Sequence, residues 1–192
     1  MKKINYRPQL DGLRALSVLA VIIYHANLNV FGFSLFSGGY LGVDVFFVLS
    51  GYLITKILVA SIYNGDFSFA SFYIARIKRI VPALFFVLLV SAIAAYYVLL
   101  PQEFELYAES LKSSLLFYSN VHFSAEDAYD AAASIYKPLL HTWSLSLEWQ
   151  FYLIFPFFIY ILYLISKNTF FISWWRGLVF HFIMQSPLSR QI

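Results

Sequence analysis

Residues 41–62 read LGVDVFFVLSGYLITKILVASI, and this run decides the fold. It contains only two charged side chains, Asp44 and Lys56. A helix needs about 20 mostly apolar residues to cross the roughly 30 Å of hydrocarbon in a bilayer. The run therefore predicts a transmembrane helix.

Similar apolar runs lie on both sides of this one. They cover approximately residues 13–31, 80–100 and 140–165. Together the runs predict an all-α fold, a polytopic transmembrane helix bundle with about four full spans plus a partial fifth.

The partial fifth span would come from the C-terminal stretch FFISWWRGLVFHFIM, residues 170–184. This stretch is short for a span, and it carries Arg176 and His181. We therefore expect residues 1–166 to form the N-terminal part of a membrane domain and residues 167–192 to be an atypical or truncated tail.

The composition agrees with a lipid environment. Hydrophobic residues make up 61% of the chain and charged residues 12%, whereas a soluble domain is about half apolar and about a quarter charged. A net charge of +3 without spare polar surface excludes a nucleic-acid partner. The absence of cysteine excludes disulfides and thiolate zinc sites.

The charges between the apolar runs are sorted by sign. Basic residues precede the first run, separate the second from the third and follow the fourth: Lys2, Lys3, Arg7, Arg76, Lys78, Arg79 and Lys167. Acidic residues gather between the third and fourth runs: Glu103, Glu105, Glu109, Glu126, Asp127 and Asp130. Because cytoplasmic loops carry the excess of Lys and Arg, this pattern predicts a cytoplasmic N-terminus.

Ionisable side chains within the apolar runs are candidate site residues, because such groups are costly in a membrane. Arg14 and His25 are eleven residues apart, close to three helical turns, so they share a face roughly 16 Å apart along the axis. Asp44 lies about one turn inside the second run. A lone His is often a packing residue, and Asp44 could instead cap its helix.

Among the charged residues within the apolar runs, Glu148 is the one that a purely structural role explains least well. It has no Lys or Arg nearby in its own run, and a buried carboxylate must find a partner or become protonated. It recurs at helical spacing with His141, Ser144 and Tyr152, so these four share one face. His141 could also be a plain interfacial residue.

Arg76 and Arg79 lie three residues apart and therefore on one helical face. Such a pair can clamp phosphate, because guanidinium groups match phosphate oxygens bidentately. The positive-inside rule would by itself also place basic residues at a cytoplasmic border, without any ligand. The sorting of Arg14, Arg76 and Arg79 to the inner edge favours an anionic ligand that enters from the cytoplasm.

Four ordered segments resemble acyltransferase family 3, whose members include bacterial O-acetyltransferases of lipopolysaccharide O-antigen and of peptidoglycan. These segments are YRPQLDGLRALSVLAVIIYH (6–25), GGYLGVDVFFVLSGYLIT (38–55), FYIARIKRIVP (72–82) and HTWSLSLEWQFYLIFP (141–156). The resemblance implies a multi-pass protein of the bacterial inner membrane. It also implies acyl-CoA (acetyl-CoA) as donor substrate with no bound cofactor or metal, and a glycan or lipid-linked sugar as the extracytoplasmic acceptor.

The resemblance also implies roles for individual residues. Arg14 and His25 would be essential for transfer, Arg76 and Arg79 would act on the acyl-CoA side, and Glu148 would be a further active-site residue. Family members usually have more spans than are predicted here, so an inactive truncated fragment is one alternative reading.

The hypothesis is acyl transfer from acyl-CoA to a sugar hydroxyl. His25 would act as general base or carry the acyl group transiently. Glu148 or Asp44 would orient its imidazole, and the three arginines would hold the CoA phosphates. A transporter or proton relay is the other alternative, because buried His and carboxylates also mark ion pathways.

Overall fold

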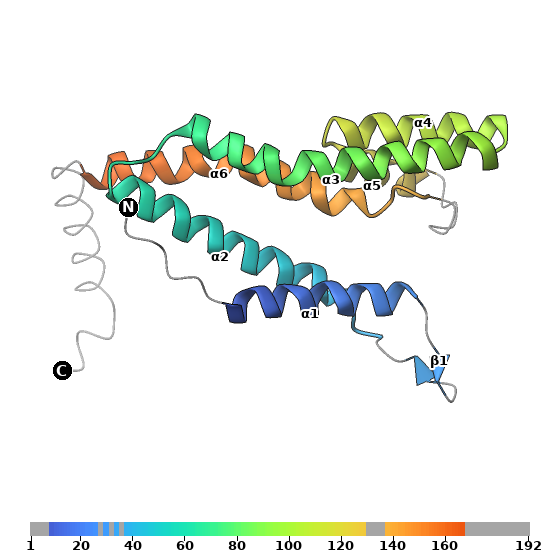
Figure 1. Ribbon diagram of the computed structural model, residues 1–192, viewed down its shortest axis with the longest axis horizontal. Helices are drawn as coiled ribbons and strands as arrows, with labels where there is room; N and C mark the ends of the chain where they lie inside the picture. The colour runs from blue at the N-terminus through green and yellow to red at the C-terminus, as the bar shows by residue number, and fades with distance from the viewer. Residues whose placement is uncertain (1–7, 27–28, 31–32, 35–36, 130–136, 168–192) are drawn as a thin grey trace, which may run out of the picture. The chain divides into compact units, whose positions relative to one another are not determined.

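The computed structural model describes residues 8–26, 29–30, 33–34, 37–129 and 137–167. The described elements, in chain order, are α1 (Pro8–His25), β1 (Asn29–Val30), β2 (Phe33–Ser34), α2 (Leu41–Tyr63), α3 (Phe69–Val98), α4 (Pro101–Leu115), α5 (Ser119–Tyr129) and α6 (Thr142–Lys167) (Figure 1). The chain divides into two compact units, Met1–Leu153 and Ile154–Ile192, and α6 begins in the first and continues into the second.

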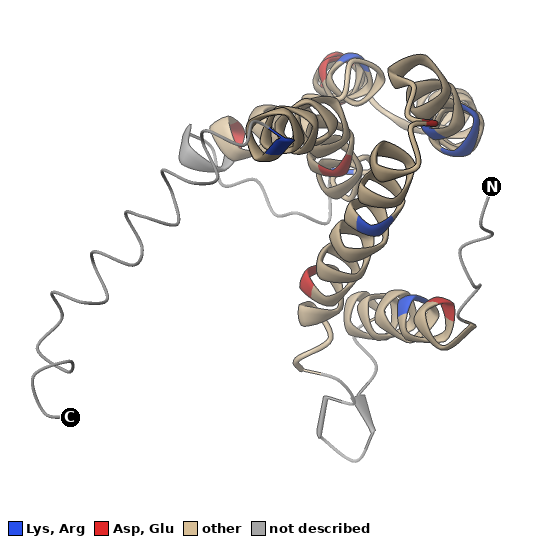
Figure 2. Ribbon diagram, turned by 90° about the vertical axis from the view of Figure 1, so that its left-hand side faces the viewer, with Lys and Arg blue, Asp and Glu red and all other residues tan. Residues whose placement is uncertain are grey.

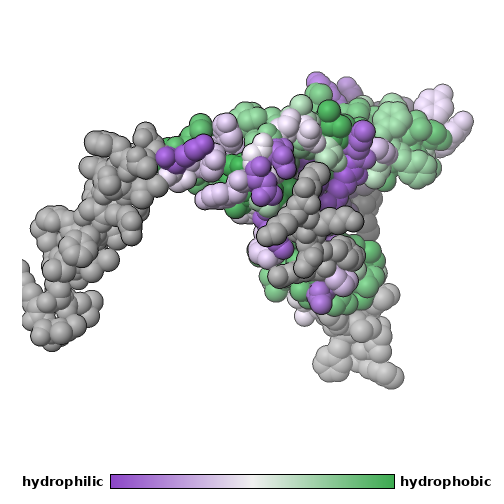
Figure 3. Space-filling model, turned by 60° about the vertical axis from the view of Figure 1, so that its left-hand side comes forward, coloured by the Kyte–Doolittle hydropathy of each residue, from purple (hydrophilic) through white to green (hydrophobic). Residues whose placement is uncertain are grey.

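Three helices of the described chain, α2, α3 and α6, are long and apolar enough to cross a membrane. Charged residues are sparse along these ribbons, and apolar side chains form much of the surface in view (Figures 2 and 3). The all-α membrane architecture is therefore confirmed. A full span by α1 remains a prediction, and the expected partial fifth span lies outside the described residues.

The helix boundaries follow the apolar runs closely for α2 and α6. α3 starts earlier than the expected span, at Phe69, where the side chain of Ser68 accepts a hydrogen bond from the backbone N–H of Ser71 at 3.4 Å. This N-cap satisfies one of the free donors at the helix start. As a result, the arginine pair belongs to the first turns of α3 rather than to a loop.

The predicted first span was too long at its C-terminal end. α1 ends at His25, and Asn29–Val30 pairs antiparallel with Phe33–Ser34. Asn29, where the first strand begins, is a residue type with low helix propensity. His25 therefore lies at the end of a helix and not midway along one.

α1 and α2 approach each other closely at two glycines, Gly42 of α2 and Gly39 in the turn before it. A Cβ on Gly39 would meet Tyr24 Cβ at 2.6 Å, and a Cβ on Gly42 would meet Val21 Cγ2 at 2.9 Å. Both would also meet backbone carbonyls of α1, including that of Ser17. Small residues allow this approach between membrane helices, where packing replaces the hydrophobic effect.

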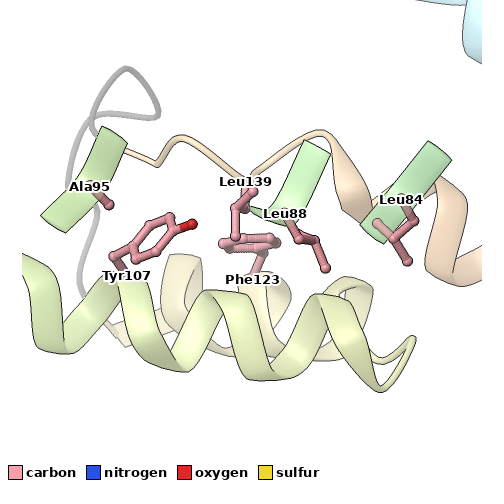
Figure 4. Packing of buried hydrophobic residues seen from close by; sticks show 6 residues of the cluster. All are labelled: Leu84, Leu88, Ala95, Tyr107, Phe123 and Leu139. Atoms are coloured by element: carbon pink, nitrogen blue, oxygen red, sulfur yellow. The ribbon is translucent and has the colours of Figure 1, made fainter. Parts of the chain in front are cut away.

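A second packed region joins α3 to the α4–α5 hairpin. Its buried residues come from α3, α4, α5 and the segment before α6: Leu84, Leu88, Ala95, Tyr107, Phe123 and Leu139. Figure 4 shows the aromatic rings of Tyr107 and Phe123 against the aliphatic side chains of α3. The Tyr107 hydroxyl also bonds to Ser91 of α3.

A buried polar network fastens this hairpin to the start of α6. Ser119 Oγ lies 2.7 Å from Ser146 Oγ, and Thr142 Oγ1 donates to Ser119 Oγ at 3.0 Å. The amides of Asn120 and Gln150 bond to each other at 3.1 and 2.9 Å. One face of α6 is thereby fixed to the hairpin, which leaves a different face for the site.

Candidate functional site

A cavity of about 200 Å³ lies between α1, α2, α3 and the first half of α6. We call it the arginine cavity, because Arg14 and Arg79 supply its cationic lining. Its other lining residues are Phe46, Ile80, Ala83, Leu84, Leu145, Glu148 and Tyr152. Two guanidinium groups from different helices thus face one space, which suits an anionic ligand.

Arg14 is held in place by α2. Its Nη2 donates a hydrogen bond to Ser50 Oγ at 3.2 Å, and its Cζ lies 4.8 Å from the centroid of the Phe46 ring. Ser50 is itself buried. Because its contacts among the described residues are one hydrogen bond and one aromatic face, this guanidinium has further N–H donors for a ligand.

Arg76 lies one turn before Arg79 on α3. Its Cζ sits 5.8 Å from the Phe72 ring centroid and 5.9 Å from that of Tyr152. Its Nε is buried, and within the described part of the chain this atom lacks a hydrogen-bond partner. The pair is therefore asymmetric: Arg79 lines the cavity, while Arg76 packs against the aromatic residues behind it.

Glu148 and Tyr152 bring negative charge and a hydroxyl to the same cavity from α6. The Tyr152 hydroxyl donates to Glu148 Oε1, and both residues line the arginine cavity. The expected partner for this half-buried carboxyl group is thus a tyrosine four residues along the same helix.

A second cavity, of about 260 Å³, adjoins the first. It lies between α1, α2 and α6, and we call it the apolar cavity because aliphatic and aromatic side chains dominate its lining. The two cavities have three lining residues in common, Phe46, Leu145 and Glu148. The apolar cavity extends from this junction to Val21 and Ile22, the turn of α1 that precedes His25.

His25 has a defined orientation at the end of α1. Its Nδ1 lies 2.9 Å from the backbone oxygen of Val21. A carbonyl oxygen only accepts hydrogen bonds, so Nδ1 carries the proton and Nε2 of the neutral ring holds the free lone pair. The ring is therefore arranged as a base at Nε2.

The nearest described aromatic neighbour of His25 across the helices is His141, immediately before α6. The two ring centroids are 4.4 Å apart with an interplanar angle of 79°, an edge-to-face contact. Burial, and then the like charge of His25, lower the pKa of His141 below its usual 6.5. The second ring is therefore neutral around pH 7.

The structure brings together some of the predicted site residues and separates others. Arg14, Arg79 and Glu148 share one cavity, with Arg76 behind them. Glu148 lines the arginine cavity, and it follows His141 by seven residues, about two helical turns. His25 itself contacts the Val21 carbonyl and the His141 ring, so the orienting role expected of Glu148 stays a prediction.

Asp44 lies in the first turn of α2, where its side chain is exposed. It follows Gly42 by two residues, about 200° around the helix. Gly42 packs against α1, so Asp44 points to another side. The alternative role of Asp44 as a helix cap is not observed, since no side-chain hydrogen bond caps the start of α2 in the described structure, and its role in orienting His25 stays a prediction.

Three residues of the site were not predicted from the sequence: Ser50, Phe46 and His141. Ser50 and Phe46 contact Arg14, and His141 contacts His25 although its sequence position also fits a plain interfacial residue. The signal for His141 and Tyr152 was their shared helical spacing with Glu148. For Ser50 and Phe46 there was no such signal, because only the pairing of α1 with α2 places them beside Arg14.

Comparison with known proteins confirms the resemblance carried by the four segments. The family model described as an acyltransferase domain matches residues 7–189. A Staphylococcus aureus protein named "Putative O-acetyltransferase" is 38% identical over 177 residues, which is 90% of this chain and 28% of that protein. The peptidoglycan O-acetyltransferase OatA of Listeria monocytogenes is 39% identical over 166 residues, 85% of this chain and 26% of that protein.

A Bacillus subtilis protein named "Putative peptidoglycan O-acetyltransferase YrhL" is 40% identical over 168 residues, 85% of this chain and 25% of that protein. The chain thus spans about a quarter of the length of these relatives. No solved structure matches it.

Proposed function

This chain belongs to acyltransferase family 3, and on that premise we propose that it moves an acetyl group from acetyl-CoA to a hydroxyl of a cell-wall glycan. The observation that carries this proposal is the pair of adjoining cavities, one cationic and one apolar, which run from the arginines to the turn before His25. The peptidoglycan acceptor is drawn from the names of two relatives.

The donor fits the two cavities in a fixed direction. Acyl-CoA has phosphates at one end and a long uncharged arm that ends in the thioester. Arg14 and Arg79 would bind the phosphates, with Arg76 adding positive charge behind them. The uncharged arm would pass Glu148 into the apolar cavity, which brings the thioester toward His25.

The transfer step would use His25 as a general base. Its Nε2 takes the proton of the acceptor hydroxyl as the oxygen attacks the thioester carbonyl, forming the C–O ester bond and breaking the C–S bond. The CoA thiolate leaves with the electron pair of the C–S bond and takes up the proton from His25. Glu148, hydrogen-bonded to Tyr152, would lie beside the passing donor.

The proposed topology is a multi-pass protein of the bacterial inner membrane with a cytoplasmic N-terminus, in which α1 completes a fourth span. Arg14 and the arginine pair would then lie toward the cytoplasm, the source of acyl-CoA. His25 and His141 would lie at the opposite end, near the acceptor.

Calorimetric titration of acetyl-CoA into the detergent-purified chain tests the donor site. We expect binding that weakens about 10- to 100-fold in Arg79→Gln, because a hydrogen bond to a charged group contributes about 1.5–3 kcal/mol. Lys78→Gln is the matched control: it removes the same charge from an exposed neighbour that does not line the arginine cavity.

The two substitutions separate site binding from general electrostatic attraction. Unchanged binding in Lys78→Gln together with weakened binding in Arg79→Gln supports the arginine cavity. An equal loss of acetyl-CoA affinity in both variants would show only long-range electrostatic attraction. An unchanged affinity in Arg79→Gln would reject the donor site.

A further inference from the structure

The contact between His25 and His141 has no counterpart in the donor site. The two rings come from different helices and meet edge to face at 4.4 Å. His141 lies immediately before α6, whose start is fixed to the α4–α5 hairpin by Thr142 and Ser146. The position of the His141 ring is therefore set independently of α1, which makes it a firm support for His25.

We propose that His141 is a positioning residue for the reaction: its neutral ring fixes the His25 imidazole so that Nε2 meets the acceptor hydroxyl. This inference rests on the proposed function. It gives His25 two supports, the Val21 carbonyl at Nδ1 and the His141 ring.

The charge state of His141 matters as much as its shape. During transfer His25 gains a proton, and a cation beside it would oppose that step. Burial and the charge of His25 lower the pKa of His141, so His141 stays neutral while His25 is charged. Among the described residues, the phenol of Tyr24 contacts His25, and the phenol of Tyr40, just before α2, contacts Tyr24.

The test compares three chains in the same lipid nanodiscs: wild type, His141→Ala and His141→Phe. Acetyl transfer from labelled acetyl-CoA to a soluble peptidoglycan fragment is measured between about pH 5 and 9. His141→Ala removes the ring, and kcat should fall about 10- to 100-fold with KM for acetyl-CoA unchanged. His141→Phe keeps a ring without a titrating group and should recover most of kcat above pH 7.

The pH profile carries the readout that a purely structural role would not change. If both rings must be neutral, log(kcat/KM) of the wild type falls with a limiting slope of two protons at acidic pH. In His141→Phe that slope should become one proton. Melting temperatures in the same nanodiscs identify any variant that fails to fold. If one of the two variants does not fold, the activity of the other tests the role of His141.

Each outcome bears on one proposal. Wild-type transfer together with unchanged kcat in His141→Ala overturns the role of His141 and leaves the proposed function intact. A folded His141→Phe that is as inactive as His141→Ala and keeps a two-proton slope also overturns it. A wild-type chain without acetyl transfer refutes the proposed function, and this inference with it.

Discussion

Replacing Gly42 by Ala perturbs the contact that positions α1, and with it Arg14 and His25. An added methyl group would lie 2.9 Å from Val21 Cγ2, and it would come closer still to the carbonyl oxygen of Ser17. Carbon atoms pack best at about 3.5–4.0 Å, so α1 and α2 would have to separate by roughly 0.6–1.1 Å. The substitution should therefore loosen the packing of α1 on α2.

The size of the effect follows from a matched control. Gly51 also lies inside α2, but a Cβ there would meet nothing within 4 Å. Ala is favoured over Gly in a helix by about 1 kcal/mol at both positions. Overpacking costs about 1–3 kcal/mol, and only Gly42→Ala suffers it. The free energies of unfolding of the two variants should thus differ by about 1–3 kcal/mol.

Thermal unfolding of both variants in one detergent measures this difference. Each kcal/mol shifts the melting temperature by about 2–4 °C for a chain of this size, so Gly42→Ala should melt roughly 2–12 °C below Gly51→Ala. Equal melting temperatures would refute the close α1–α2 contact, and the placement of Arg14 beside α2 would fall with it.

Four further outcomes are expected. Ser50→Ala should leave Arg14 without its hydrogen bond and weaken acetyl-CoA binding severalfold by calorimetry; full affinity would contradict that support. In a histidine-ring NMR titration, His141 should titrate below 6.5, and its pKa should rise in His25→Ala because a like charge is removed; no rise would contradict the coupling. Since the folded-state pKa of His141 is lowered, stability should fall as pH drops below about 6.5, as thermal scans at several pH values would show. Ser146→Ala should lower the free energy of unfolding by about 1–3 kcal/mol, because the buried backbone N–H of Ser119 loses its hydrogen bond to Ser146 Oγ; unchanged unfolding would contradict the buried network.

The sequence alone was enough to predict three helices that are long and apolar enough to cross a membrane, and to single out the charged side chains that line the arginine cavity. Apolar runs depend on local composition, so α2 and α6 begin close to their expected residues. The end of α1 was predicted too late, because an apolar run continues through residues that form β1 and β2. Composition marks what lipid can cover, whereas turn-forming residues decide where a helix stops.

The arrangement of the site could be predicted only in part. Helical spacing along one element correctly grouped Ser144, Glu148 and Tyr152, because that spacing is fixed by the helix itself. Distances between elements depend on which faces pack together. The hypothesis that Glu148 orients His25 depends on such a distance, whereas the cavity shared by Glu148, Arg14 and Arg79 became visible only in the structure.

The central proposal is that acyl-CoA enters the space where the arginine cavity and the apolar cavity meet. The chain has no cysteine, so a single Cys at Leu145, which lines both cavities, can be compared with one at Leu147, which is exposed and lines neither. The measurement is the rate at which a small thiol reagent modifies each Cys, with and without a thioether analogue of acetyl-CoA. We expect the analogue to slow modification at position 145 several-fold and to leave position 147 unchanged. Equal rates at position 145 with and without the analogue would contradict the proposed donor path.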